Sequence, residues 1–471
     1  MQDTINHSGY ISIGRMVDNK ETTKVESNTV RYAYEFNCGD LVIHAFERIP
    51  EIDGKNAVTA CDFDDIEYLF YSKLPFSFPD FSNYPQNNHQ KIDFAVKNYK
   101  RGSKYKEAVF DFAELQFFCP SGSVVKEDEE RNVIFSGKPK NISTFNIEVN
   151  SIECEVSFII GAKGKWGFAR SMMEAVTELH ISFPETDDFK FINNLYLVVD
   201  CVFAFICNRR NSTCLSMKVK GTYPSKFIDN DKFVDCIKHC DSEIYYFDKY
   251  REDPENEKII AKTWTESLFF KHIDALFTMV SDDISGKLED GGKISIASIH
   301  PSIKRRNLID LQQSIQISSA FEFYVRRYLP NMMEEKSHHV IMKMILKEIE
   351  AKSTGKLREL AKSLSKNVVR EPALEDKVIK VYKGYDKWPA LALCISEDWY
   401  KPDEIRALGD EANQWRNELA HAKRSYEPSE NTVRAIRLLE HMNYAIVLRK
   451  IGFSDEEIKK ILENALIRQY Y

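Results

Sequence analysis

The pattern of apolar residues changes near the middle of this 471-residue chain. Before residue 250, short segments rich in β-branched and aromatic residues predominate, and apolar–polar alternation is clearest over residues 144–149 and 153–158. After Ser302, apolar residues recur at helical spacing through several long segments. A chain of this length is expected to divide into roughly two or three domains. We therefore predict an α+β protein with a β-rich N-terminal domain over residues 1–250, a helical linker region over 251–300 and an all-α bundle over 301–471.

Two helices are expected to interrupt the β-rich half. Residues 190–209 are apolar on all faces of a helix, which predicts a buried helix, and residues 227–239 predict a shorter amphipathic one. A Phe-Pro pair, Phe183-Pro184, indicates a turn ahead of the buried helix. In the second half, helices are expected over residues 259–280, 308–328, 338–351, 356–366, 402–423, 432–451 and 455–465. Ser454 with Glu457 predicts the start of the last helix, and Gly452 the end of the one before it.

The composition of the chain argues against a membrane protein, a disulfide-stabilised protein and a zinc protein. The longest apolar stretch, residues 191–207, contains two asparagines and an aspartate, so we expect no membrane span and no membrane partner. The start of the chain lacks a signal pattern, and the ten cysteines form no disulfide framework, which favours the reducing cytoplasm. Cys236, His239 and Cys240 lack a second pair of zinc ligands, so buried thiols are the expected reading. The net charge of −7 means that any surface for nucleic acid must be local or assembled from two subunits.

One expected helix, residues 402–423, carries a chemically suggestive set of polar side chains. Asn417 and His421 are four residues apart and therefore lie on one helical face, and the long side chain of Arg416 reaches the same place. Ala412 and Trp415 are expected to face the core. Histidine moves protons near neutral pH, and arginine stabilises the charge that builds on a phosphate in a transition state. Together these groups can cleave a phosphodiester without a metal.

The spacing of Arg416 and His421 is weak evidence by itself. A chain with this composition contains roughly half an arginine–histidine match at this spacing by chance. Arg434 and His441 on the next expected helix form a looser match, which is either a decoy or a neighbour of the site. The plain alternative for Arg416 and His421 is a solvated helix face with a partly buried histidine.

In context, these residues resemble the HEPN superfamily, small helical-bundle domains that carry an R-x4–6-H motif often written RNxxxH. The resemblance covers about residues 300–471 in architecture, and its specific part is Arg416 to His421. Related domains often place an acidic residue on the first bundle helix, which makes Glu322 the candidate for orienting Arg416 or His421. A salt bridge from Glu322 to Arg326 is the competing interpretation. The two-part layout, including residues 152–221, is similar to ApeA-type HEPN proteins of bacterial anti-phage systems.

The resemblance implies a metal-independent endoribonuclease that uses no cofactor and acts as a homodimer through its helical domain. RNA is the expected substrate, because the 2′-hydroxyl would attack the adjacent phosphate. His421 would move the proton, Arg416 would stabilise the phosphate charge, and Asn417 would fix the histidine or a phosphate oxygen by hydrogen bonding. Lys423 and Arg424 are expected to bind RNA, and the N-terminal domain to bind a phage-derived trigger. The alternative is a non-catalytic HEPN-like protein that dimerises or binds RNA or a nucleotide.

Overall fold

The computed structural model describes residues 6–13, 30–37, 39–45, 54–64, 66–77, 86–119, 125–127, 133–135, 139–166, 171–207, 212–229, 232–247, 264–286, 311–329, 337–368, 374–384, 404–420 and 428–462. The chain forms two compact units, one of Met1–Tyr196 with Thr213–Arg251 and one of Leu197–Ser212 with Glu252–Tyr471. The first unit ends next to the boundary expected at residue 250. The second unit includes the helix of the expected linker region and also the end of helix α2 (Phe189–Ile206), which the sequence pattern did not indicate.

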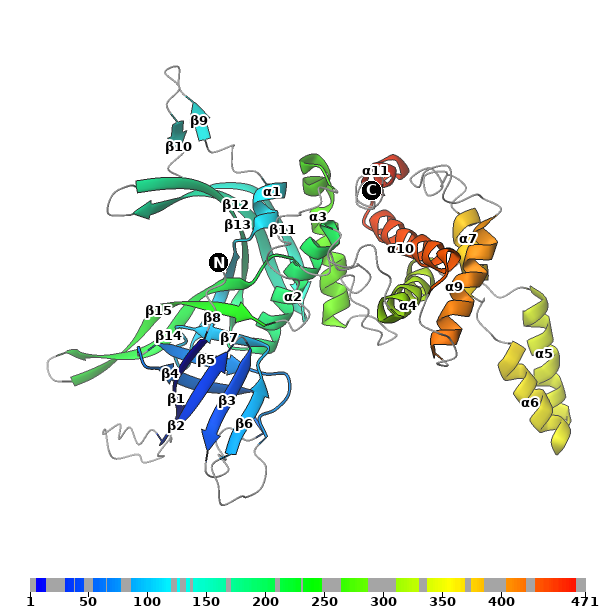
Figure 1. Ribbon diagram of the computed structural model, residues 1–471, viewed down its shortest axis with the longest axis horizontal. Helices are drawn as coiled ribbons and strands as arrows, with labels where there is room; N and C mark the ends of the chain where they lie inside the picture. The colour runs from blue at the N-terminus through cyan, green and yellow to red at the C-terminus, as the bar shows by residue number, and fades with distance from the viewer. Residues whose placement is uncertain are drawn as a thin grey trace. The chain divides into compact units, whose positions relative to one another are not determined.

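The first unit is built on an antiparallel sheet, and the predicted α+β layout is confirmed (Figure 1). Thirteen of the described strands are hydrogen-bonded in the order β11-β12-β13-β8-β14-β15-β7-β5-β4-β1-β2-β3-β6. Their bounds are β1 Asn6–Ile13, β2 Val30–Asn37, β3 Asp40–Ala45, β4 Ala57–Asp62, β5 Glu67–Tyr71, β6 Gln86–Lys91, β7 Phe94–Lys97, β8 Lys104–Phe110, β11 Lys140–Val149, β12 Ile152–Trp166, β13 Ser171–Thr186, β14 Ser216–Asp229 and β15 Lys232–Tyr246. Strands β9 (Val125–Glu127) and β10 (Val133–Phe135) pair separately, and helix α1 spans Ala113–Phe118.

The segments with the clearest alternation form the hairpin of β11 and β12. Val149 pairs with Ile152, and the two turn residues Asn150 and Ser151 have positive φ angles of 51° and 65°. Asparagine tolerates this left-handed conformation better than most residues. Near this turn the burial alternates along both strands: Ile147, Val149, Cys154 and Val156 are buried, whereas Asn146, Glu148, Glu153 and Glu155 are exposed.

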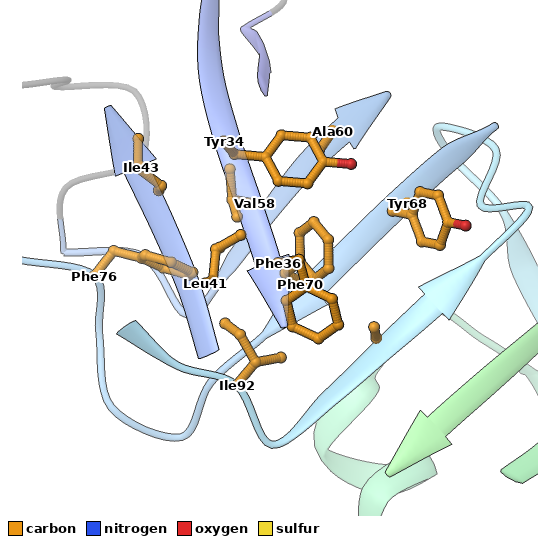
Figure 2. Packing of buried hydrophobic residues seen from close by; sticks show 11 residues of the cluster. Tyr34, Phe36, Leu41, Ile43, Val58, Ala60, Tyr68, Phe70, Phe76 and Ile92 are labelled. Atoms are coloured by element: carbon orange, nitrogen blue, oxygen red, sulfur yellow. The ribbon is translucent and has the colours of Figure 1, made fainter. Parts of the chain in front are cut away.

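Two aromatic groups form the interior of the first unit. Figure 2 shows the cluster on the strands near the N-terminus, in which the ring of Phe70 contacts the rings of Tyr34 and Phe36. The start of α2 packs on the other strands, where Phe189 contacts Phe94, Tyr99 and Tyr105. Among the described helices, α2 is long and apolar enough to cross a membrane, but 72% of it is buried, as in a core helix. Its predicted burial is confirmed.

Two expectations for the first unit are wrong. The described residues of the segment 227–239 are not helical; they form the end of β14 and the first half of β15, where backbone pairing overrides the helical spacing of the apolar residues. Phe183-Pro184 is not a turn, because β13 continues to Thr186. Pro184 is accommodated where the pairing of β13 with β8 shifts register between Ser182 and Thr186, so the missing N–H leaves no gap in the ladder.

In the second unit, α10 (Glu430–Lys450) is buried along most of its length and packs against α4, α9 and α11. Tyr444 stacks on Phe205 at the end of α2 and donates to its carbonyl oxygen at 2.9 Å, and Asn443 donates to the carbonyl of Ile317 at 3.0 Å. The other helices of the unit are α3 Glu266–Ser285, α4 Leu311–Tyr328, α5 Ser337–Lys352, α6 Lys356–Val368, α7 Leu374–Gly384, α9 Ile405–Ala420 and α11 Asp455–Leu462.

The predicted signals at the end of α10 and the start of α11 are confirmed. Gly452 has a φ of 97° and its N–H donates to the carbonyl of Arg449, which ends α10. Ser454 and Glu457 form a capping box, because each side chain accepts from the other residue's backbone N–H, at 2.8 and 3.4 Å. By contrast, α7 was not expected from the sequence.

His180 lies in an ion cluster on the sheet of the first unit. Its Nδ1 is 2.6 Å from Glu107 and its Nε2 is 3.4 Å from Glu178. Burial by itself would lower the pKa of His180, but the hydrogen bonds to Glu178 and Glu107 outweigh burial and raise the pKa above its ordinary value. The protonated ring therefore stabilises the fold below the unfolded pKa, and this contribution is lost as the pH rises through the raised folded pKa.

We predict that His180→Gln lowers the free energy of unfolding by roughly 1–2 kcal/mol at pH 6, because charge-assisted hydrogen bonds are lost. At pH 9 the difference from the wild type is expected to shrink, because the charge of the ring is lost as the pH rises through its raised pKa. Urea unfolding followed by circular dichroism at both pH values measures this. The exposed His239 on β15 supplies the control, His239→Gln, which leaves the ion cluster of His180 intact. An equal loss at both pH values for His180→Gln would contradict the charged clamp.

Candidate functional site

Helix α9 separates its packing side from its polar side as the sequence indicated. Ala412 and Trp415 are fully buried, Arg416 is half-buried and Asn417 is exposed. The large Trp415 ring thus fixes the rotation of the helix and leaves the two polar side chains beside it at the surface of the unit. His421, Lys423 and Arg424 lie outside the described residues, so their expected roles stay predictions.

Glu322 on α4 contacts Arg416. The guanidinium donates from Nη1 to Glu322 Oε2 at 2.6 Å, although the two residues are 94 positions apart in the chain. The structure therefore brings together the acidic residue expected on the first bundle helix and the arginine of the motif. A carboxylate in this position restricts the guanidinium to one orientation, because the interaction is both ionic and directional.

Lys377 on α7 is the second cation at this carboxylate. Its Nζ donates to Glu322 Oε1 at 3.0 Å, and its side chain is only 1% exposed. Glu322 thus uses one oxygen for each cation and joins α4, α7 and α9. Sequence reasoning missed Lys377, because its helix was not expected and a lone lysine in that segment carries no signal of its own.

Asn413 completes the polar group one turn before Arg416 on α9. Its Oδ1 accepts from Arg416 Nη2 at 3.3 Å and lies 3.5 Å from Asn417 Nδ2. The spacing of three and four residues places all three side chains on adjacent positions of one helix surface. That spacing was visible in the sequence and is the signal by which Asn413 could have been found.

Gly409 allows α9 to approach α7 closely. A Cβ atom added at Gly409 would lie 3.0 Å from the Cα of Glu375 and 3.4 Å from the Cβ of Val378. Those atoms belong to the first turns of α7, which also carry Lys377. Because Gly409 has no side chain, α7 and α9 can lie close enough for Lys377 and Arg416 to contact the same carboxylate.

The second arginine–histidine pair on α10 does not form a comparable site. Arg434 donates to Glu404 at 2.9 Å, whereas His441 is buried in the helix core. Burial, reinforced by the nearby positive charge of Arg437, lowers the pKa of His441 to about 3. A histidine held neutral in this way does not exchange protons near neutral pH. The structure therefore favours the interpretation that the match of Arg434 and His441 to the motif is coincidental.

The polar group has the composition of an anion site. Arg416 and Lys377 both donate to the carboxylate of Glu322, so two cationic side chains meet at this group. The lysine is buried, whereas Arg416 and Asn417 reach the surface, so a ligand would meet the guanidinium and the amide first. Arginine has further N–H donors beyond those given to Glu322 and Asn413, and these suit a phosphate oxygen.

A comparison of the chain with protein-family models, curated proteins and solved structures finds no match.

We predict that Glu322→Gln destabilises the second unit by roughly 1–3 kcal/mol, because it removes the anion that compensates the buried charge of Lys377. Adding Lys377→Met is expected to recover at least half of the loss, since a well-packed apolar side chain then replaces the buried ammonium group. Urea unfolding followed by the fluorescence of the buried Trp264 and Trp415 reports on this unit. If the double variant is less stable than Glu322→Gln, the proposed balance of charge is wrong.

Proposed function

We propose that the protein is a metal-independent endoribonuclease of the HEPN type that acts in the cytoplasm in bacterial anti-phage defence. The observation that supports this most directly is the 2.6 Å ion pair between Arg416 and Glu322. It restrains the motif arginine next to the exposed Asn417, on the helix that leads to His421 in the sequence. A restrained guanidinium at a surface is what stabilisation of a phosphate transition state requires, because no reorganisation is then needed during the reaction.

In the proposed reaction, the 2′-oxygen of a ribose forms a bond to the adjacent phosphorus while the bond from phosphorus to the 5′-oxygen breaks. His421, from one or both subunits, removes the proton of the 2′-hydroxyl and delivers a proton to the departing 5′-oxygen. Arg416 binds the non-bridging oxygens, on which negative charge builds. Asn417 donates a hydrogen bond to a phosphate oxygen or to the histidine. DNA lacks the 2′-hydroxyl and is therefore not a substrate.

The proposed active form is a homodimer in which two such sites face each other. The whole chain has a net charge of −7 and therefore repels RNA, which is a polyanion. Pairing would help RNA binding as well as catalysis, because it places the cationic side chains of two subunits at one surface. Two copies of the Arg416 cluster placed together, with Lys423 and Arg424 nearby in the sequence, would double the local positive charge. The N-terminal unit is proposed to bind a phage-derived trigger and to restrain the nuclease until then.

A non-catalytic role is the second candidate, and the same ion cluster favours it. Glu322 joins α4, α7 and α9 through Lys377 and Arg416, so the arginine contributes to stability whether or not it meets a phosphate. In that case the helical unit would dimerise or bind RNA or a nucleotide without cutting it. The two candidates differ in whether Arg416 and His421 are needed for bond cleavage or only for folding and binding.

The test is RNA cleavage in EDTA by the full chain and its variants. Arg416→Ala and His421→Ala are each expected to lower the cleavage rate by at least about a hundred-fold, because each removes a transition-state contribution of that order. Arg406→Ala, at an exposed position earlier on α9, and His239→Ala are the matched controls and should keep the wild-type rate. Circular dichroism is used to check that each variant folds. Folded variants of both motif residues that cut RNA at the wild-type rate would rule out the nuclease and leave the binding role.

A further inference from the structure

The hairpin of α5 and α6 concentrates positive charge. The two helices lie along each other and are joined by a short turn at Gly355, whose φ is 60° (Figure 1). Residues 337–368 contain seven basic and three acidic residues, a net charge of +4. Because the whole chain carries −7, the rest of it carries −11. In an acidic chain, a hairpin of this charge is the kind of local positive surface that a nucleic acid requires.

Helical geometry gathers part of this charge on one side of the hairpin. The buried Leu346 of α5 and the buried Ala361 of α6 mark where the two helices face each other. Lys347 and Lys362 each follow one of these residues by one position. Successive residues turn by about 100° in a fixed sense, so this equal step on two antiparallel helices leads to the same side. The residues four positions earlier lie on that side too. The basic side of the hairpin comprises Lys343, Lys347, Arg358 and Lys362.

The charges of the basic side are largely uncompensated. Lys347, Arg358 and Lys362 are exposed. Within the described part of the chain these three cations form no ion pair, in contrast to Lys352, which pairs with Glu348. Each helix also places two cations of this side four residues apart, where like charges repel each other and weaken the helix. An anion bound to the basic side would remove that repulsion.

The side of the hairpin opposite to these cations is apolar. Ile345 and Leu360, which precede the two buried contact residues, are exposed there, and Val340 and Met344 are exposed on the outer side of α5. A contact made through Ile345 and Leu360 leaves the basic side facing solvent. A membrane surface would instead favour cations placed around the apolar side chains, so that both meet the lipid together. The separation of charge from apolar surface therefore favours a partner that is recognised by charge alone.

The phosphate backbone of a nucleic acid is such a partner. Arginine binds phosphate oxygens through its fork of N–H donors, and lysine neutralises a phosphate as a point charge. Cations repeated at one-turn spacing on two adjacent helices match a polymer of regularly spaced charges better than a single anion. Residues 340–368 contain no Phe, Tyr or Trp on which a base could stack. Contacts to phosphate alone carry no sequence information, so binding here is independent of base sequence.

We infer that the basic side of the α5–α6 hairpin binds the phosphate backbone of RNA, at a surface separate from the Arg416 site. The inference rests on the proposed function in one respect, namely that RNA rather than DNA is the nucleic acid held there. The hairpin connects α4 to α7, the helices that carry Glu322 and Lys377, and belongs to the same compact unit. Its cations contribute to the binding of RNA and not to the breaking of the bond.

The test measures how the full chain binds fluorescein-labelled oligouridine with methylated 2′-hydroxyls, by fluorescence anisotropy over a salt series in EDTA. This probe cannot be cut by 2′-hydroxyl attack, so binding is measured independently of cleavage. Lys347→Gln with Arg358→Gln and Lys362→Gln is expected to weaken binding at least about ten-fold at about 0.1 M salt. The slope of log affinity against log salt should fall in magnitude by about 2, because each lost contact to a single strand contributes about 0.7.

The matched control removes the same charge from the sheet of the first unit. Arg101→Gln with Lys104→Gln and Lys218→Gln also replaces one arginine and two lysines at exposed positions, and it should keep the wild-type affinity and slope. Acetylation of lysines by acetic anhydride, followed by mass spectrometry of the wild type, needs no variant to fold. Oligouridine is expected to protect Lys347 and Lys362 and to leave Lys104 and Lys218 reactive.

Equal weakening by the control variant, an unchanged slope in the hairpin variant, or no protection of Lys347 and Lys362 would overturn the inference. Displacement of the probe by oligoglutamate of equal charge would assign the surface to an acidic protein instead. Protection by phosphatidylserine vesicles but not by oligouridine would assign it to a membrane.

Cleavage of unmodified RNA is scored separately. The hairpin variant is expected to show a higher KM with the rate at saturating RNA retained, because its cations bind the substrate and the transition state equally. A wild type that binds the probe as expected but cuts no RNA retains the binding surface and rejects the nuclease. A wild type that cuts RNA while Lys347 and Lys362 stay reactive retains the nuclease and rejects the binding surface.

Discussion

The carboxylate of Glu322 is the interaction on which the site depends. It accepts from Arg416 and Lys377 on separate oxygens and so links three helices that are distant in the chain. Burial of an ammonium group is costly unless an anion compensates it, so Lys377 makes the position of the carboxylate hard to change. Arg416 binds the same carboxylate, so the position of its guanidinium is fixed as well. An ion network that stabilises the helical unit thereby also orients the one guanidinium proposed to meet a phosphate.

Several features of the molecule followed from periodicity and local chemistry. Alternation over β11 and β12, the apolar surface of α2 and the Ser454–Glu457 capping box each depend on residues close in sequence, and each was predicted correctly. The segment 227–239 was predicted wrongly because its helical spacing competes with pairing to a neighbouring strand, an interaction that no local pattern encodes.

At the candidate site, too, contacts within one helix could be predicted from the sequence, whereas contacts between helices could not be derived from local patterns. Asn413, Arg416 and Asn417 share one helix, so their proximity follows from spacing alone. The contact with Glu322 was anticipated through a family resemblance rather than through physics, since 94 residues separate the partners. Lys377 and the close approach at Gly409 could not be predicted, because both arise from the packing of α7 on α9. Long-range contacts of this kind are specified by the whole unit rather than by a motif.

In the proposed reaction, an RNA 2′-hydroxyl serves as the nucleophile at the Arg416 site, without a metal. The chemical identity of the RNA ends formed after incubation with the full chain in EDTA, determined by mass spectrometry, tests this step. We expect a 2′,3′-cyclic phosphate on one fragment and a 5′-hydroxyl on the other. Fragments that end in a 3′-hydroxyl and a 5′-phosphate would show that water attacks instead, and would contradict it.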